Sequence, residues 1–245
     1  MIFCRKPKIE FHNVIKGLDE IYSIKKSSSL LPDWWKKTNP NDGQRFYNGT
    51  PLVPGNIKKC PGISDFLLDG HIIPAWTDMF IDPTQPGPRG DSCKIDVAMV
   101  SQSCTINAFN TSTFREYLPP QIKCDHIIRI QTPWAIKTSS GHSIQILDPF
   151  YFFNTDFVCA PGILDTDAYH SLSVQLMVKS DKPFIIPFGS PLCIVRPFKR
   201  EKYTSKIFKK NEKGDSLFTK SFFIKSCKFL ETSIYNSIRK NKCPF

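Results

Sequence analysis

The stretch "HIIRIQTPWAIKTSSGHSIQILDPFYFF", residues 126–153, places short apolar runs between turn residues at Pro133 and at 139–141. The same pattern continues in "SLSVQLMV" (171–178), "PFIIPF" (183–188) and "PLCIVRPF" (191–198). Short runs rich in β-branched and aromatic residues, separated by turns at regular spacing, are typical of antiparallel barrels and sandwiches. We therefore expect a compact β barrel or sandwich over residues 124–199.

The composition favours the same class. The 245 residues include 20 Phe and 20 Pro but only 12 Gly. Frequent prolines and aromatic residues suit short strands joined by irregular loops better than a helix bundle. We predict a β-rich α+β fold, mostly antiparallel, with few short helices, a C-terminal helix and one main globular unit.

Residues 1–123 are expected to form a β-rich part packed on that core. "PKIEFHNVI" (7–15) reads as a strand, and Pro32 with Asp33 opens a short helix. Within it, the adjacent Trp34 and Trp35 cannot both face the same side. We expect one tryptophan in the core and the other against a neighbouring surface or a partner.

Residues 58–101 continue with a helix and two strands. Pro61 begins a short helix and Gly70 ends it, followed by a strand over 71–81 and another over 93–101. His71, Asp78 and Asp82 lack a partner histidine at a metal-ligand spacing, so we interpret them as polar residues of a strand edge. The sequence predicts no metal site and no cofactor.

The cysteines indicate a reducing compartment. They stand at positions 4, 60, 93, 104, 124, 159, 193, 227 and 243, with no CxxC pair and several inside apolar strand patterns. We interpret them as reduced, mostly buried side chains. No run reaches the roughly 18 apolar residues that span a bilayer, and "MIFCRKPKIEFHNV" lacks a signal peptide's apolar stretch. A soluble protein made in a cytoplasm, without a membrane partner, is expected.

The net charge of +11 lies mainly near the C-terminus, where residues 200–245 carry 12 Lys or Arg against 4 Asp or Glu. Such a tail can attract nucleic acid. The simpler interpretation is a solvated face of a protein from an AT-rich genome. Apolar residues from Phe218 to Ile238 follow helical spacing, which predicts an amphipathic terminal helix. The candidate interaction residues are Trp34, Trp35, Lys209, Lys210, Lys225 and Lys228.

Residues 135–198 resemble the dUTPase and dCTP-deaminase superfamily, whose barrel is of the β-clip type. "GILDTDAY" (162–169) matches the family's hairpin motif at Gly162, Leu164 and Asp165, with Tyr169 one place late. "FGSPLCIV" (188–195) resembles the family's later glycine turn at Gly189. "AIKTSSGHSIQILDPFYF" (135–152) is similar to the strands before its phosphate-binding motif. The resemblance implies a ligand turn formed by Asp165, Asp167, Tyr169 and Gly189.

The departures from that family argue against its chemistry. Asp148-Pro149-Phe150-Tyr151 stands where the family has a Pro-Arg-Ser-Gly phosphate cradle, and a Lys-rich tail with Gly214 replaces its glycine-rich arm. A lone carboxylate without phosphate ligands or a Mg²⁺ site cannot carry pyrophosphate hydrolysis. We interpret Asp165 and Asp167 as turn-forming residues and expect no catalytic residues.

Four short motifs together resemble a family of proteins from tailed bacteriophages, including marine T4-like phages. They are "KKCPGISDFLLDGHIIPAWTD" (58–78), "TPWAIKTSSG" (132–141), "GILDTD" (162–167) and "IPFGSPLCIVRPFKRE" (186–201). The resemblance implies a viral origin and brings no catalytic residues with it.

Three functions compete. We favour a non-catalytic virion structural or assembly protein. Its expected partners are other viral structural proteins or further copies of itself, for example in a homotrimer. Its expected location is the host cytoplasm during infection, or the virion. The second is a nucleotide-binding enzyme whose phosphate ligands are Arg129, Lys137, Arg196 and Lys199. The third is a nucleic-acid-binding protein acting through the basic tail, residues 200–245.

Overall fold

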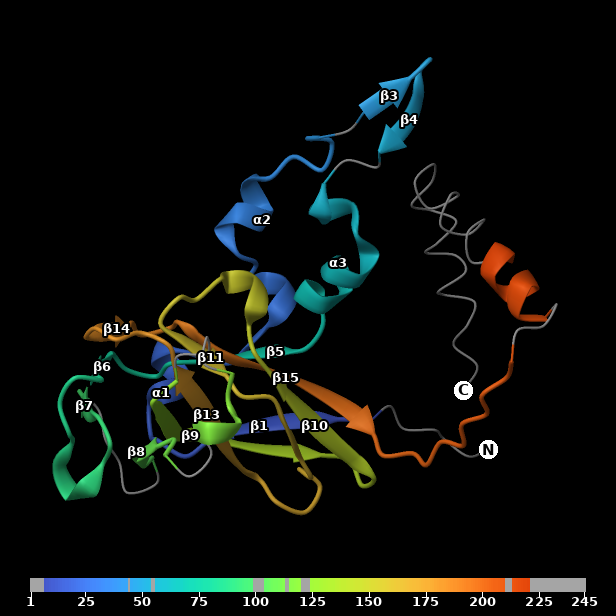
Figure 1. The fold of residues 1–245 in the computed structure, drawn as a ribbon. Coiled ribbons are helices and arrows are strands. Elements are labelled where there is room, and N and C mark those ends of the chain that lie inside the picture. The colour runs from blue at the N-terminus through green and yellow to red at the C-terminus, as the bar shows by residue number, and fades with distance from the viewer. Residues whose placement is uncertain are drawn as a thin grey trace. The chain divides into compact units, whose positions relative to one another are not determined.

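The computed structural model describes residues 7–43, 45–53, 56–98, 104–112, 115–119, 124–209 and 213–220. By their backbone contacts, residues 1–39 and 60–200 form one compact unit and residues 40–59 and 201–245 a second. Figure 1 shows the elements of both. Each unit is described by itself.

The first unit contains two five-stranded sheets and a smaller third one. The first sheet runs β1 (Ile9–Asn13), β9 (His126–Thr138), β13 (Ser171–Val178), β11 (Phe157–Cys159), with β8 (Ile106–Asn110) also paired to β9. The second runs β12 (Gly162–Leu164), β10 (His142–Leu147), β15 (Pro191–Lys199), β5 (His71–Pro74), β2 (Lys25–Lys26). The third runs β14 (Phe184–Ile186), β6 (Met79–Asp82), β7 (Lys94–Val97).

Every strand pair in these sheets is antiparallel. The expected fold class, β-rich and antiparallel with short helices, is therefore confirmed. The turn at 139–141 carries the chain from β9 of the first sheet into β10 of the second. Its Gly141 has φ +75°, a conformation that glycine adopts without strain.

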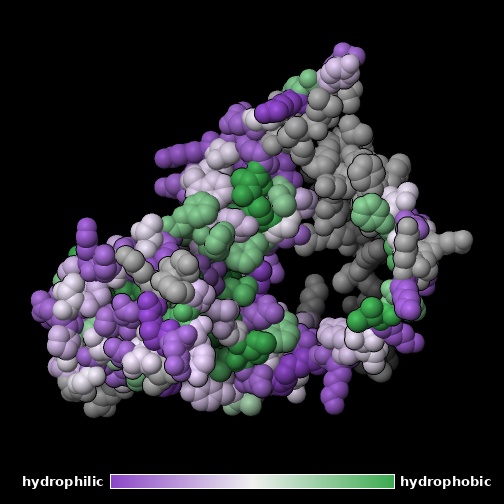
Figure 2. Space-filling view, viewed as in Figure 1, coloured by the Kyte–Doolittle hydropathy of each residue, from purple (hydrophilic) through white to green (hydrophobic). Residues whose placement is uncertain are grey.

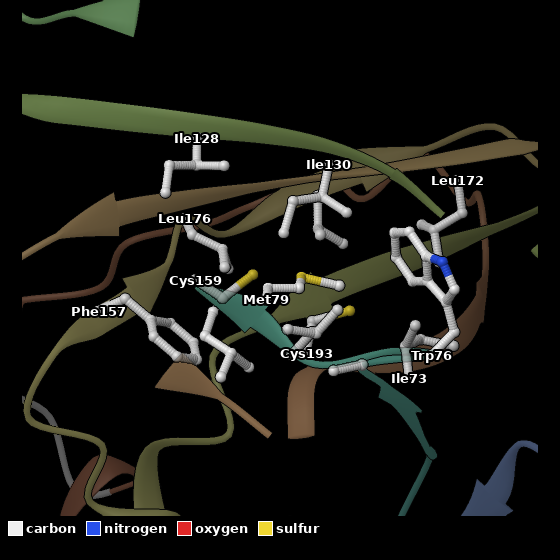
Figure 3. Packing of buried hydrophobic residues seen from close by; sticks show 14 of the residues in the cluster. Ile73, Trp76, Met79, Ile128, Ile130, Phe157, Cys159, Leu172, Leu176 and Cys193 are labelled. Atoms are coloured by element: carbon white, nitrogen blue, oxygen red, sulfur yellow. The ribbon is translucent and has the colours of Figure 1, made fainter. Parts of the chain in front are cut away.

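The core lies between the two larger sheets because alternate residues of their strands point inward. Figure 3 shows Ile128, Ile130 and Leu176 of the first sheet packed toward Ile73 and Cys193 of the second. All five side chains are at most 1% exposed. Burial of each Ile or Leu stabilises the fold by about 1.5–3 kcal/mol.

The helices of the first unit are short: α1 (Leu18–Ile21), α2 (Asp33–Lys37), α3 (Pro61–Leu68), and the 3₁₀ turns η1 (Ser27–Ser29), η3 (Pro88–Gly90), η4 (Arg115–Tyr117) and η5 (Phe150–Phe152). The helices expected at Pro32 and Pro61 are thus confirmed. Gly70 follows α3 with φ +91°. A Cβ at Gly70 would meet the Val195 carbonyl oxygen at 2.7 Å, so the position requires glycine.

The prediction of a single strand over residues 71–81 was wrong. β5 ends at Pro74, which has no N–H for a further ladder bond, and β6 begins at Met79 in another sheet. Between them the Ala75 N–H donates to the Ser190 carbonyl (2.8 Å). The buried Trp76 turns into the core. Of the strand expected over 93–101, β7 covers Lys94–Val97, and its last three positions lie outside the described residues.

The units of the structure differ from the division predicted from the sequence, which placed boundaries between the segments 1–123, 124–199 and 200–245. β1 and β5 come from the first segment, yet they pair with β9 and β15 of the second inside the same two sheets. Residues 40–59, in contrast, group with the C-terminal residues. No sequence boundary near 123 separates two folded parts.

The second unit contains the hairpin of β3 (Arg45–Tyr47) and β4 (Thr50–Val53), the 3₁₀ turn η2 (Ile57–Lys59), and a helical segment at 213–220. Asn48 and Gly49 both have positive φ (48° and 77°), as a two-residue Asn-Gly hairpin turn requires. The remainder of the expected terminal helix lies outside the described residues. None of the described helices is long and apolar enough to cross a membrane.

The cysteines of the described part are free thiols. Cys60 is exposed, and Cys93, Cys104, Cys124, Cys159 and Cys193 are buried. Burial raises the pKa of the Cys93 thiol to about 11, so it stays protonated near neutral pH. The interpretation as buried, reduced side chains is confirmed for these five residues. Positions 4, 227 and 243 lie outside the described residues.

Candidate functional site

The aspartate turn, residues 165–169, joins β12 to β13. The Asp165 carbonyl oxygen accepts the N–H groups of Ala168 (3.0 Å) and Tyr169 (2.8 Å). Beneath the turn, the fully buried Thr166 hydroxyl lies 2.8 Å from that of Thr138. The turn is therefore closed by the backbone carbonyl of Asp165 and not by its side chain, which leaves the carboxylate available for other partners.

Those partners form the Arg200 network, which we define as Arg200, Asp165, Asp167 and Ser143. The Arg200 guanidinium lies 3.0 Å from Asp165 Oδ1 and 2.5 Å from Asp167 Oδ2. Ser143 Oγ donates to Asp165 (2.5 Å) and accepts from Arg200 (2.9 Å). The Gly141 N–H donates to Asp167 (2.8 Å). Both oxygens of Asp167 are bonded to Arg200 and its side chain is 12% exposed, whereas Asp165 is bonded through Oδ1 and its side chain is 60% exposed.

These contacts stabilise the charged carboxylates. The Ser143 hydrogen bond and then the Arg200 guanidinium lower the pKa of Asp165. The Arg200 hydrogen bond and then the Gly141 N–H lower the pKa of Asp167. A general base for catalysis at neutral pH needs a pKa near 7, so neither carboxylate is tuned for that task.

Gly189, the other half of the expected ligand turn, lies elsewhere. It precedes β15 with φ +79°, and its N–H donates to the Ala75 carbonyl (2.8 Å), whereas Arg200 directly follows β15. Nine extended residues separate those two ends by roughly 30 Å. Tyr169 is 54% exposed beside Asp165. The structure brings Asp165, Asp167 and Tyr169 together and leaves Gly189 apart.

The four expected phosphate ligands do not gather either. Arg129 and Lys137 are exposed on β9 of the first sheet, eight residues apart along one strand. Arg196 and Lys199 lie on β15 of the second sheet. Arg196 is occupied: its guanidinium stacks on the Phe66 ring at 4.4 Å and donates to the Phe66 and Asp69 carbonyls. No phosphate cradle forms from this set.

The three polar residues His71, Asp78 and Asp82 do not form a common site. Asp78 accepts the Phe188 N–H (2.7 Å), and Asp82 accepts the N–H and hydroxyl of Thr84 (2.9 and 2.6 Å). Burial lowers the pKa of His71. Nowhere in the described ranges do three or more His, Cys, Asp or Glu side chains gather as metal ligands.

Aromatic side chains gather at another place in the first unit. We define the aromatic surface as Trp34, Phe150, Tyr151 and Phe153. The Trp34 ring centroid lies 5.4 Å from Phe153 and 6.4 Å from Tyr151, and Phe150 lies 5.2 Å from Tyr151. The Trp34 indole N–H donates to the Tyr151 carbonyl (2.7 Å). Figure 2 shows apolar surface gathered over this part of the molecule.

The two tryptophans divide their roles as expected. Trp35 is 7% exposed and its ring meets Trp34 edge-on at 5.5 Å. Trp34 covers the segment after β10 and is half-buried. Phe150 and Phe153 remain 60% and 55% exposed. The aromatic surface is therefore an exposed pair of phenylalanines on a base of packed rings.

Phe153 adopts a left-handed backbone conformation, with φ 53° and ψ 45°. It ends η5, where its N–H donates to the Phe150 carbonyl (3.1 Å), and Asn154 then turns the chain toward β11 by accepting the Asp156 and Phe157 N–H groups. A bulky aromatic residue in this region costs of order 1–2 kcal/mol relative to glycine. Here the strained residue is also one of the exposed aromatic side chains.

Sequence reasoning missed part of this arrangement. "DPFYFF" (148–153) was considered only for its lack of phosphate ligands, although the four consecutive aromatic residues directly after Pro149 are themselves a signal. Asp148 instead accepts the Cys159 N–H (2.8 Å), and burial raises its pKa. The contact of Arg200 with both aspartates could not be predicted, because no local sequence signal indicates it.

Of the candidate interaction lysines, Lys209 is exposed, and Lys210, Lys225 and Lys228 lie outside the described residues.

No protein-family model matches this chain, and no curated protein matches it. Among solved structures, the chain has weak structural similarity to one described as native EIAV dUTPase, with 9% sequence identity and a TM-score of 0.30. The match covers 55% of this chain and 98% of that chain. A likeness at this level carries no argument about activity.

Proposed function

We propose that this protein is a non-catalytic viral structural or assembly component whose aromatic surface binds protein, with a second copy of the same chain as the first partner. The observation that carries the proposal is the exposure of Phe150 and Phe153 on a packed aromatic base. Exposed aromatic anchors held by rigid neighbours are typical of the residues that dominate protein interfaces.

Charge supports a second copy as the partner. The first unit carries 19 Lys or Arg and 17 Asp or Glu, a net charge of only +2. Repulsion between two copies of the chain, each at +11, therefore comes mainly from the second unit and not from the unit that carries the aromatic surface. On α2, Asp33 and Lys36 form an exposed pair at 3.2 Å beside Trp34, which is complementary to its own image across a two-fold axis.

The test is the mass of the full chain in solution. Light scattering over a range of concentrations is expected to show a concentration-dependent oligomer. The same measurement on Phe150→Ala/Phe153→Gly is expected to show a monomer. A wild-type chain that stays monomeric at the highest concentrations would exclude self-association through this surface.

The competing enzyme hypothesis has a separate test. Both carboxylates of the aspartate turn are engaged by Arg200, which favours a structural role. We therefore expect dUTP, dCTP and dTTP, with or without Mg²⁺, to leave the melting temperature unchanged. A nucleotide at 100 times its dissociation constant would stabilise the fold by about 2.7 kcal/mol, so a clear upward shift would favour the enzyme.

A further inference from the structure

We infer that the second unit binds single-stranded nucleic acid through aromatic side chains that alternate with lysine and arginine on the hairpin β3–β4 and on residues 202–209. This goes beyond the proposed function, because it concerns a different unit and a different class of partner.

The charge of the chain is concentrated in this unit. Residues 40–59 and 201–245 contain 14 Lys or Arg and 5 Asp or Glu, so they carry +9 of the net +11. In the described part of the chain, none of Arg45, Lys202, Lys206 and Lys209 forms an ion pair with a carboxylate. Unpaired cations at this density attract the phosphates of a nucleic acid.

Aromatic residues stand directly beside these cations. Phe46 and Tyr47 follow Arg45 on β3 and are 59% and 66% exposed. Adjacent strand residues point to opposite faces, so both faces of the hairpin present an aromatic ring. An isolated two-stranded hairpin is marginally stable in water, and a partner stacked on its rings would stabilise it.

The same pairing recurs after Arg200. Tyr203 follows Lys202 and is 84% exposed, and Phe208 precedes Lys209 and is 72% exposed. A solvated lysine-rich face accounts for the lysines but not for exposed rings among them. Cations that track a backbone, with rings on which bases stack, are the means by which proteins hold unpaired strands.

Exposed rings favour a single strand over a duplex. Bases inside a duplex are already stacked on one another, and only unpaired bases offer free faces to Phe46, Tyr47, Tyr203 and Phe208. The shared chemistry of the ligand is a sugar-phosphate chain with unstacked bases, which single-stranded DNA and RNA both provide.

The experiment uses the full chain and fluorescein-labelled oligothymidylate and oligouridylate of about 30 nucleotides. Fluorescence anisotropy is measured at 50 and 200 mM salt. If four cations contact phosphates, the affinity is expected to fall by about fifty-fold between these concentrations. Comparison of the two oligonucleotides shows which sugar is preferred.

Two sets of variants test the residues. Phe46→Ala/Tyr47→Ala is expected to weaken binding by about thirtyfold or more, since the variant removes two rings and each stacked base contributes about 1–3 kcal/mol. Lys202→Gln/Lys206→Gln/Lys209→Gln is expected to reduce the slope of log affinity against log salt by about 2. Tyr117→Ala, which removes a 78% exposed ring from the first unit, is the matched control and should bind as the wild type. Circular dichroism confirms that each variant is folded.

Three results would overturn the inference. The first is no binding of either oligonucleotide at 50 mM salt with protein up to about 100 µM. The second is tighter binding of duplex DNA than of the single strand. The third is salt-dependent binding that the aromatic variant leaves unchanged, because the unit would then attract polyanions without stacking on bases.

Discussion

Phe153 combines strain with exposure at a single residue. Its left-handed backbone is a conformation that glycine adopts freely and phenylalanine does not. Its ring is only partly packed, against Trp34 and Phe150. A residue that costs stability and shields little apolar area is most simply explained by a role on the surface.

At this position the usual ranking of alanine and glycine is expected to invert. Phe153→Ala and Phe153→Gly both remove the ring, but only alanine keeps the strain of positive φ. We expect Phe153→Gly to be more stable than Phe153→Ala by about 1 kcal/mol, measured from urea denaturation midpoints. A more stable alanine variant would show that the position is not left-handed in solution.

The aspartates of the Arg200 network predict a pH dependence at the same scale. Their pKa values are lowered in the folded state, so the stability that they contribute is present above the unfolded value of about 4 and is lost as the pH falls through the folded values. We expect the melting temperature of Asp165→Asn/Asp167→Asn to fall less between pH 7 and pH 3 than that of the wild type. Equal falls would contradict the assignment.

At the scale of elements, the periodicity of apolar residues predicted where strands lie, but not which strands pair in the same sheet. The strands on either side of the turn at 139–141 were foreseen because apolar alternation and turn residues are local signals. The break expected at Pro133 was wrong: β9 runs through Pro133, and the irregularity lies in its pairing with β13, whose register shifts between Ser171 and Ser173. The division of 71–81 was not foreseen, since β5 and β6 belong to different sheets and the pairing of distant strands leaves no local signal in the sequence.

The same limit applies to the candidate sites. The turn at Asp165 and the division between Trp34 and Trp35 followed from residue types and spacing. The Arg200 network did not, because β15 carries Arg200 to the aspartates from more than thirty residues away. The separation of Gly189 from Asp165 also depends on the extended length of β15, which a motif comparison does not measure.

The Arg200 network also marks the end of the first unit, and this gives a prediction for truncated chains. Arg200 is bonded to Gly141, Ser143 and both aspartates, and the next residue belongs to the second unit. We expect a chain of residues 1–200 to melt cooperatively near the temperature of the full chain. A chain of residues 1–199, which lacks only Arg200 by comparison, is expected to melt a few degrees lower.

Calorimetry of the two truncated chains checks this directly. Identical melting temperatures would show that Arg200 adds nothing to the first unit. Loss of the cooperative transition in both would show that the first unit depends on residues 201–245.

For the whole molecule, the structure separates two kinds of surface. The first unit is nearly neutral and carries the aromatic surface, whereas the second carries most of the positive charge and the exposed rings of β3. The sequence alone located the basic tail but not its grouping with residues 40–59, because contacts between distant segments leave no periodic signal. On this account the two surfaces serve different partners and can be disabled independently.

The central claim, that the aromatic surface binds a second copy, is tested most directly by sedimentation equilibrium of matched variants of the full chain. Phe150→Ala/Phe153→Gly is expected to weaken the self-association constant by about thirtyfold or more, a loss of about 2 kcal/mol. Phe109→Ala/Tyr117→Ala, which removes two exposed rings elsewhere on the first unit, should associate as the wild type does. Equal association constants for the wild type and the Phe150/Phe153 variant would contradict the claim.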